Sequence, residues 1–258
     1  MIEEKEYGIN VNGSSEHLGD CLELMQHIPD ASIDMIFCDL PYGTTKNKWD
    51  SIIPLDLLWK QYNRVIKERG AIVLFAQTPF DKVLGASNLK MLKYEWIWEK
   101  FRATGNLNAK KMPMKKHENL LVFYKKAPTY NPQGLIKLES PKTEKLRQSN
   151  SSNYGLRNRD WVQEYTNYPK SILSVKEEHN VGRLHPTQKP LNLCKYFIET
   201  YTNENEIVLD NTAGVFSTAI ACLETDRKYI VMEKEKEYYN KGIKRILEWK
   251  KNKASILL

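Results

Sequence analysis

Short apolar runs alternate with amphipathic stretches over most of the chain. The run from Met35 to Cys38 is wholly apolar, and its short length is typical of a buried central strand. Further apolar runs predict strands at 72–76, 94–98, 118–124, 207–210 and 229–232. Apolar residues spaced three or four positions apart predict helices near 19–29, 54–67, 79–86, 191–201, 215–223 and 236–250. Gly70 is expected to end the second of these helices. This alternation indicates an α/β fold with a largely parallel sheet.

The apolar periodicity fades from about Ala127 to Gly182, where Ser, Asn, Tyr, Lys and Arg accumulate. Two interpretations remain open for this segment: a disordered tract, or an insertion that contacts nucleic acid. Its scattered aromatic residues favour the insertion, because disordered tracts are poor in aromatics. The chain is therefore predicted to divide into residues 1–126, an insertion at 127–182, and residues 183–258.

Positive charge is concentrated in the middle of the chain. The net charge is +7 over 258 residues. Residues 99–190 contain 18 Lys or Arg and 8 Asp or Glu, a balance of +10, so the rest carries +7 − 10 = −3. A basic block on an otherwise near-neutral chain is typical of a protein that binds a polyanion such as nucleic acid.

The remaining composition favours a cytoplasmic protein. No apolar run approaches the length of a membrane span, and the first twelve residues do not resemble a signal peptide. The four cysteines lie far apart without the spacing of a zinc site, which is typical of buried, reduced thiols. No membrane or metal partner is expected.

A candidate for chemistry follows the predicted central strand, in the tetrapeptide Asp39, Leu40, Pro41 and Tyr42. In open α/β sheets, ligands bind beyond the carboxyl ends of the strands. Pro41 stiffens the turn and removes a backbone donor. Tyr42 places an aromatic ring beside the acid, at a position where chemistry can happen. A purely structural Asp-x-Pro turn is the alternative interpretation.

Five segments occur in one characteristic order: GDCLE from residue 19, DLPY from residue 39, HPTQKP from residue 185, IVLD from residue 207, and Glu233. In this order the chain resembles the beta-type S-adenosylmethionine-dependent DNA amino-methyltransferases. The resemblance implies a doubly wound, mostly parallel, seven-stranded Rossmann-like sheet with a basic recognition insertion. It implies methyl transfer to adenine N6 of a base flipped out of double-stranded DNA. Relatives of this type often form homodimers.

The resemblance also implies roles for individual residues. Asp39, Leu40, Pro41 and Tyr42 would be catalytic, with Asp39 accepting hydrogen bonds from the target amino group. The implied S-adenosylmethionine-binding residues are Asp20, Cys21, Asp39, Lys189, Asp210, Thr212, Gly214 and Glu233. The family's target-recognition region makes Arg157 and Arg159 candidates for nucleic-acid contacts. The charge pattern of residues 102–117 itself predicts phosphate contacts by Lys110, Lys111, Lys115 and Lys116, with a solvated loop as the alternative interpretation. For Asp20, capping of the helix that follows is an equally good interpretation and does not exclude cofactor binding.

The sequence departs from the family pattern at two places. Leu40 replaces the first proline of the tetrapeptide, and Gly214 is followed by Val215 and Phe216 where relatives usually have a G-x-G step. Phenylalanine offers neither the close approach nor the backbone freedom of glycine. A catalytically silent nucleic-acid-binding homologue, or a regulatory subunit, is therefore an alternative. Cytosine N4, RNA adenine and protein glutamine amides are alternative targets, although Asp39 favours adenine.

Overall fold

The computed structural model describes residues 9–43, 51–144, 161–175 and 188–256. The chain forms two compact units, one made of residues 1–131 and 171–258 and the other of residues 132–170. Within the described ranges, no helix has the length and apolar character needed to cross a lipid bilayer.

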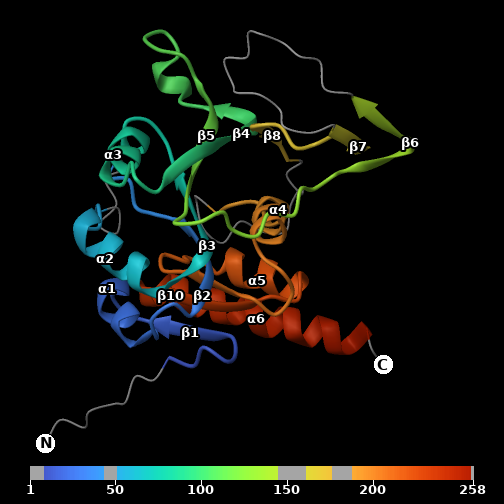
Figure 1. Cartoon of the computed structure of the whole chain (residues 1–258). Helices are drawn as coiled ribbons and strands as arrows, with labels where there is room; N and C mark the ends of the chain where they lie inside the picture. Colours follow the sequence, from blue (N-terminus) through green and yellow to red (C-terminus); the bar gives the residue numbers. More distant parts are fainter. Residues whose placement is uncertain (1–8, 44–50, 145–160, 176–187, 257–258) are drawn as a thin grey trace, which may run out of the picture. The chain divides into compact units, whose positions relative to one another are not determined.

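An eight-stranded sheet organises the larger unit, with the order β1-β10-β9-β2-β3-β5-β4-β8 (Figure 1). Its strands are β1 (Ser15–Leu18), β2 (Ile33–Asp39), β3 (Ile66–Ala76), β4 (Leu92–Thr104), β5 (Lys115–Phe123), β8 (Ile172–Ser174), β9 (Ile207–Asp210) and β10 (Lys228–Glu233). In the described chain, every neighbouring pair is parallel except the two pairs that β5 makes with β3 and β4.

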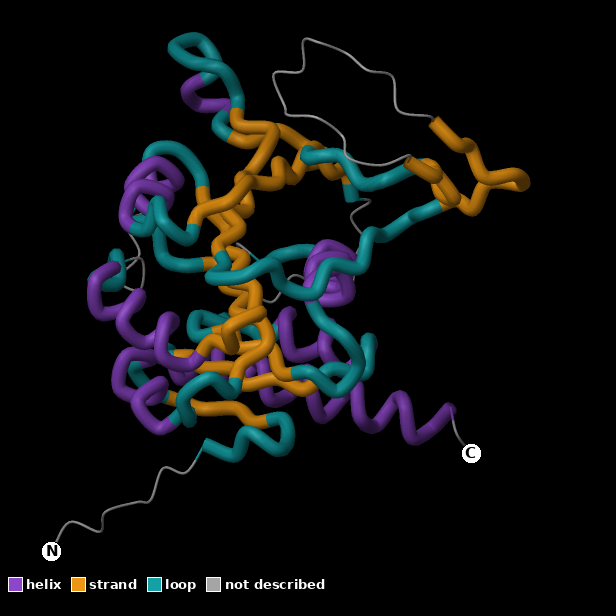
Figure 2. The backbone as a smooth tube through the Cα atoms, viewed as in Figure 1, coloured by secondary structure: helices purple, strands orange, loops and turns teal. Residues whose placement is uncertain are grey.

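Helices cover both faces of this sheet, which makes it doubly wound. They are α1 (Cys21–Leu24), α2 (Leu55–Val65), α3 (Phe80–Ser87), α4 (Leu191–Tyr201), α5 (Ser217–Glu224) and α6 (Lys236–Ile256), with 3₁₀ turns η1 (Met25–His27) and η2 (Asn106–Asn108). Helices α1, α2 and α3 pack into one hydrophobic cluster, and α4, α5 and α6 pack into another. Figure 2 shows the strands between these two sets of helices.

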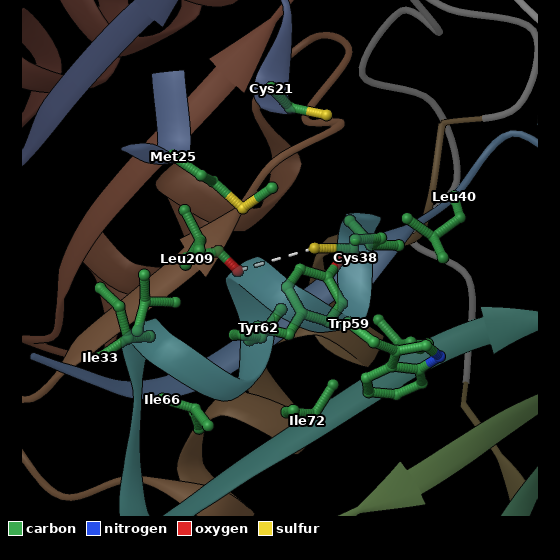
Figure 3. Packing of buried hydrophobic residues seen from close by; sticks show 14 of the residues in the cluster. Cys21, Met25, Ile33, Cys38, Leu40, Trp59, Tyr62, Ile66, Ile72 and Leu209 are labelled. Atoms are coloured by element: carbon green, nitrogen blue, oxygen red, sulfur yellow. Dashed lines mark hydrogen bonds between the residues drawn. The ribbon is translucent and has the colours of Figure 1, made fainter. Parts of the chain in front are cut away.

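The alternation of side chains along β2 explains how this one strand contributes to both hydrophobic clusters. Ile36 and Cys38 point to the cluster under α1 and α2, whereas Met35 and Phe37 point to the opposite cluster. Successive strand residues face opposite sides of a sheet, so an unbroken apolar run requires cover on both faces. Figure 3 shows the first cluster, where Cys38 and Tyr62 lie among aliphatic side chains.

The strands β2 and β9 mark the point where the chain changes from one face of the sheet to the other. They pair in parallel, with Met35 opposite Val208 and Ile36 opposite Leu209. The helix after β2 is α2 on one face, and the helix after β9 is α5 on the other. In doubly wound sheets such a switch point is where ligands bind, beyond the carboxyl ends of the strands.

The predicted fold class is confirmed, with differences in detail. The sheet has eight described strands instead of seven, because β8 adds a three-residue strand beside β4. Neither β1 nor β8 was predicted, since each has only three or four residues. The interpretation of Gly70 as a helix end was wrong: α2 ends at Val65, and Gly70 lies inside β3. A Cβ at Gly70 would approach the Asp34 carbonyl oxygen to 2.8 Å, so close packing explains this glycine.

The smaller unit contains the strands β6 (Ile136–Glu144) and β7 (Trp161–Thr166), which pair in an antiparallel ladder. Next to the ladder, the side-chain amide of Asn167 donates to the Gly134 carbonyl at 2.7 Å. Two residues predicted to bind nucleic acid, Arg157 and Arg159, lie outside the described residues.

Candidate active site at the carboxyl edge of the sheet

The tetrapeptide after β2 holds a carboxylate and an aromatic ring together. The Tyr42 hydroxyl donates to Asp39 Oδ1 at 2.6 Å. The Tyr42 ring stacks on Phe80, with ring centroids 5.3 Å apart and an interplanar angle of 29°. Leu40 is buried, whereas the Asp39 side chain is 27% exposed. The turn therefore buries its leucine and leaves the carboxylate accessible at the edge of the sheet.

Lys189 joins this turn to two further charged side chains. Its Nζ lies 2.5 Å from Asp39 Oδ2 and 3.2 Å from Glu118 Oε2. The other oxygen of Glu118 accepts from Lys100. The Lys189 ammonium also lies over the Phe75 ring, 4.8 Å from its centroid. Two cations and two carboxylates thus alternate in one partly buried network.

Electrostatics keep this network charged. Burial acts to raise the pKa of Glu118, but Lys189 and Lys100 outweigh it, so the pKa lies below its usual value. Burial acts to lower the pKa of Lys189, but Asp39 and Glu118 outweigh it, so the pKa lies above its usual value. Lys189 is the central cation, because its removal would leave Asp39 without a cationic partner among the described residues and Glu118 with Lys100 alone; for fully buried pairs such a loss typically costs about 3–5 kcal/mol.

A second turn follows β9 and touches the first. The Thr212 hydroxyl donates to the Asp39 carbonyl at 3.1 Å. The Asp210 carboxylate accepts from the Thr212 backbone N–H at 3.1 Å and from the Thr218 hydroxyl at 2.6 Å. Burial raises the pKa of Asp210 to about 7. Asp210 therefore holds the turn after β9 against the start of α5.

The same turn presents open backbone at Gly214, whose φ is +54°. Apart from its two chain neighbours, no atom of the described residues lies within 4 Å of the position that a Cβ would take there. The Gly214 N–H donates to Glu233 Oε2 at 2.7 Å, and the Glu235 N–H donates to Glu233 Oε1 at 2.7 Å. Burial raises the pKa of Glu233. Glu233 thus braces a turn whose glycine has room for a ligand beside it.

Asn211 lies buried between the two turns. Its Oδ1 accepts from the Tyr62 hydroxyl at 2.6 Å and from the Cys38 thiol at 2.9 Å. Its Nδ2 lies near the Cys21 thiol, but it makes no hydrogen bond of normal geometry within the described part of the chain. Burial raises the pKa of Cys21, which keeps this thiol neutral. A buried donor of this kind suits a ligand that brings an acceptor.

Asp20 caps α1, as one of its two interpretations predicted. Its Oδ1 accepts from the Leu22 N–H at 2.9 Å, and its Oδ2 lies 3.3 Å from Lys234 Nζ. Cys21, the next residue, lines the same region as Asn211. The contact of Asp20 with a cofactor stays a prediction.

The chain matches a known protein family over most of its length. Residues 33–244 match the family model N6_N4_Mtase, described as DNA methylase. This chain is a member of the DNA methylase family. DNA adenine methyltransferase YhdJ of Escherichia coli strain K12 is 29% identical over 244 residues, which cover 88% of this chain and 81% of YhdJ. Type II methyltransferase M2.MboI of Moraxella bovis is 26% identical and covers 85% of this chain and 82% of its own.

Solved structures share the fold of this DNA methylase. A crystal structure of the M1.HpyAVI–SAM complex has a TM-score of 0.62 at 23% identity and covers 90% of this chain and 98% of its own. The cytosine-N4-specific PvuII DNA methyltransferase has a TM-score of 0.68 at 17% identity and covers 90% and 85%.

Phe216 is the residue on which the alternative of a catalytically silent homologue rests, and its side chain packs against α6. Its ring is fully buried and lies edge-on against Tyr239 of α6, with centroids 5.6 Å apart. Gly242 of α6 makes room for the ring, because a Cβ there would lie 2.3 Å from Phe216 Cδ2. The backbone of Phe216 adopts a left-handed conformation with φ 65° and ψ 39°. The bulky side chain of this methylase therefore packs against α6 and leaves the open side of Gly214 clear.

The predicted basic residues lie on an arm formed by β4, η2 and β5. Lys110 and Lys111 follow η2 and are exposed. Lys115 and Lys116 instead lie in β5 itself. Their ammonium groups contact Gln77 at 3.3 Å and Glu99 at 2.8 Å. At the base of the arm is a cavity of about 110 Å³, lined by Gln77, Thr78, Lys115, His117, Glu118 and Asn119.

Sequence reasoning missed Lys100, Glu118 and Asn211. Glu118 precedes the apolar run of β5, and a single acid at the head of a buried strand is a usable signal for a polar site. Asn211 directly follows Asp210, the end of a predicted strand, and the sequence analysis considered only the acid at this position. Lys100 lies among many lysines, so nothing in the sequence marks it as the partner of Glu118.

Gly242→Ala is expected to lower the free energy of unfolding by about 1–3 kcal/mol, because the added methyl group collides with the Phe216 ring. Urea unfolding measures this change. Gly85→Ala in α3 is the matched control: its nearest neighbour would be Leu92 at 3.5 Å, an ordinary contact. The control should be neutral or up to about 1 kcal/mol more stable. Equal effects of both variants would contradict the packing of Phe216 in the Gly242 slot.

Asp210 predicts a pH dependence of stability. Its pKa is about 7 in the folded protein and about 3.9 when unfolded. The resulting stabilisation is fully present below the unfolded value and is lost as the pH rises through 7. The free energy of unfolding should therefore fall relative to that of Asp210→Asn by a few kcal/mol, to order of magnitude, between pH 4 and pH 7.5. Unfolding of the free protein across this range measures the difference, and a constant offset would contradict it.

Proposed function

We propose that this protein transfers a methyl group from S-adenosylmethionine to adenine N6 of a base extruded from double-stranded DNA. Membership in the DNA methylase family supports methylation of DNA. Adenine is supported by the similarity to YhdJ, a DNA adenine methyltransferase, and by the aspartate that begins the tetrapeptide after β2. The single observation that carries the proposal is the meeting of Asp39, Tyr42 and Lys189 at the carboxyl edge of the sheet.

The residues of the second turn fit the methyl donor. The open face of Gly214 lets a ligand approach the backbone closely. Glu233, at the end of the strand beside β9, would meet ribose hydroxyls. Asn211 Nδ2 is a buried donor near Cys21. When bound there, S-adenosylmethionine supplies an electrophilic methyl group on a sulfonium, whose sulfur keeps the electron pair of the broken bond.

Asp39 prepares the target amine for attack. The lone pair of an adenine amino group is delocalised into the ring, which makes the nitrogen a weak nucleophile. The Asp39 carboxylate and a backbone carbonyl of the turn would accept its two hydrogens and so favour the pyramidal, attacking nitrogen. Each carboxylate oxygen has two lone pairs, so Asp39 keeps acceptor capacity beside Tyr42 and Lys189. After transfer, the surplus proton on N6 passes to this carboxylate.

Tyr42 and Lys189 hold the reacting groups in place. Tyr42 provides a stacking face for the extruded base, a contact worth about 1–3 kcal/mol. Phe80 packs against the Tyr42 ring and fixes its orientation. Lys189 orients Asp39 and in turn depends on Glu118. The expected contact of Lys189 with the methionine carboxylate of the cofactor stays a prediction, as do a homodimer and a cytoplasmic location.

A catalytically silent homologue is not favoured. That alternative was suggested by Phe216 in the turn after β9, and the ring of Phe216 packs against α6. Cytosine N4 is the competing target, since the fold is shared with the cytosine-specific PvuII enzyme. The same amine-activating geometry serves both bases, so identification of the modified base separates them.

Asp39→Ala should reduce methyl transfer to DNA by at least about 100-fold, because the amine loses its acceptor. The assay uses labelled cofactor and mixed-sequence duplex DNA, followed by identification of the methylated base in a digest. Binding of DNA should be largely retained, because the predicted phosphate contacts lie on other residues. Asp56→Ala, on the exposed face of α2, is the matched control. Methylated cytosine would redirect the proposal to N4, and full activity of Asp39→Ala would remove Asp39 from the mechanism.

Replacement of Lys110 and Lys111 by Ala should flatten the salt dependence of DNA affinity. Each phosphate contact contributes about 0.9 to the slope of log K against log salt, so the slope should fall by up to about 2. The exposed pair Lys250 and Lys251 on α6 is the matched control. Fluorescence anisotropy at several salt concentrations measures the slope. An unchanged slope would place the phosphate contacts elsewhere.

A further inference from the structure

The arm carries a leucine at its tip that no other part of the described chain covers. The arm consists of residues 99–117: the end of β4, η2 and the start of β5. Leu107, in the middle of η2, is 99% exposed. Figure 2 shows the arm extending beyond the sheet, with η2 close to its end. Phe101, Met112 and Met114 on the same arm are also exposed apolar residues.

The arm rises from the same edge of the sheet as Asp39. The cross-strand register places Asp39 level with Phe75, Phe75 level with Leu120, and Leu120 level with Trp96. β4 then continues from Trp96 to its end at Thr104. Thr104 pairs with Lys115, which lies five residues from Leu120 along β5, so at about 3.3 Å per residue β4 ends roughly 16 Å past the level of Asp39.

This reach is sufficient to enter a duplex that presents a base to Asp39. The grooves of B-DNA are about 7.5–8.5 Å deep, far less than the length of the arm. Only β3 and β5 lie between β2 and β4, so the arm stands about three strand spacings, or about 14 Å, from the catalytic carboxylate. The tip and Asp39 can therefore contact the same few base pairs.

The charge of the arm identifies its partner as a polyanion. Residues 99–117 contain six Lys or Arg residues and a single acid, Glu99. Lys100 and Lys116 are neutralised by Glu118 and Glu99, but the others remain available to a ligand. A second copy of this chain would bring one basic arm against another, which like-charge repulsion disfavours. DNA satisfies the charge and also offers stacked bases to an apolar tip.

We propose that Leu107 is a wedge that enters the base stack next to the target and occupies the space that the extruded base leaves. Apolar side chains inserted between base steps are a known way to unstack a duplex. Extrusion of a base into an active site requires the same unstacking. The inference rests on the proposed function and adds a residue that lowers the cost of extrusion, remote from the groups that touch the reacting amine.

The test compares wild-type protein with Leu107→Ala on two duplexes that carry the site at which the wild type methylates DNA. In one duplex the target adenine is paired with thymine, and in the other it faces a mismatch. On the paired duplex, Leu107→Ala should lower kcat/KM by about 10- to 100-fold, which matches the burial of one leucine side chain. On the mismatched duplex the loss should largely disappear, because a mispaired base is extruded more easily.

Further variants make the result specific to the wedge. Leu107→Met should retain activity on both duplexes, because it keeps an apolar side chain of similar size. Leu89→Ala makes the same change at a 69% exposed leucine before β4 and should leave kcat/KM unchanged on both duplexes. With 2-aminopurine at the target position, wild-type protein should raise the fluorescence on binding and Leu107→Ala should not.

Three results would overturn the wedge. An equal loss on the paired and mismatched duplexes would make Leu107 a general contact, and no loss on either would remove it from the reaction. A shift from dimer to monomer in light scattering of Leu107→Ala would make the tip an interface between copies. Failure of the proposed function is distinguishable, because it appears as an absence of DNA methylation by the wild-type protein itself.

Discussion

The ammonium of Lys189, held between two carboxylates, is the contact on which the candidate site depends. It joins Asp39, 150 positions earlier in the chain, to Glu118 on a different strand. Both contacts are short and largely shielded from water, so solvent screens them little. The segment before α4 is therefore fixed to the turn after β2 by charge. Without this ion pair, the carboxylate of Asp39 would rely on Tyr42 alone for its orientation.

The pairing of β2 with β9 provides the frame for this contact. It places the ends of two strands, from opposite ends of the sequence, at the centre of one sheet edge. One strand ends in Asp39, the acid that we propose activates the target, and the other is followed by the turn that we propose holds the methyl donor. Because both strands are buried on both faces, their positions are set by core packing and do not depend on ligands. The chemistry therefore rests on a rigid base.

Much of this arrangement can be predicted from the sequence, because strand ends and turn residues are local signals. Asp39, Asp210 and Glu233 all follow short apolar runs, and the structure places each at the end of its strand. Glu118 and Lys100 could not be predicted as a pair, since their contact depends on the register of β4 against β5. The prediction for Gly70 was wrong because a glycine after a helical pattern usually ends the helix. Here the glycine lies inside β3, where a side chain would collide with the backbone of Asp34.

The sequence also marked Phe216 as unusual without indicating where its ring would go. The direction is decided by the missing side chain at Gly242, 26 positions later, which no local pattern can reveal. This match between a ring and a slot has an evolutionary consequence. A larger residue at position 242 overpacks the core while phenylalanine occupies position 216. Substitutions at these two positions are therefore expected to be coupled, although the positions lie on different elements of the fold.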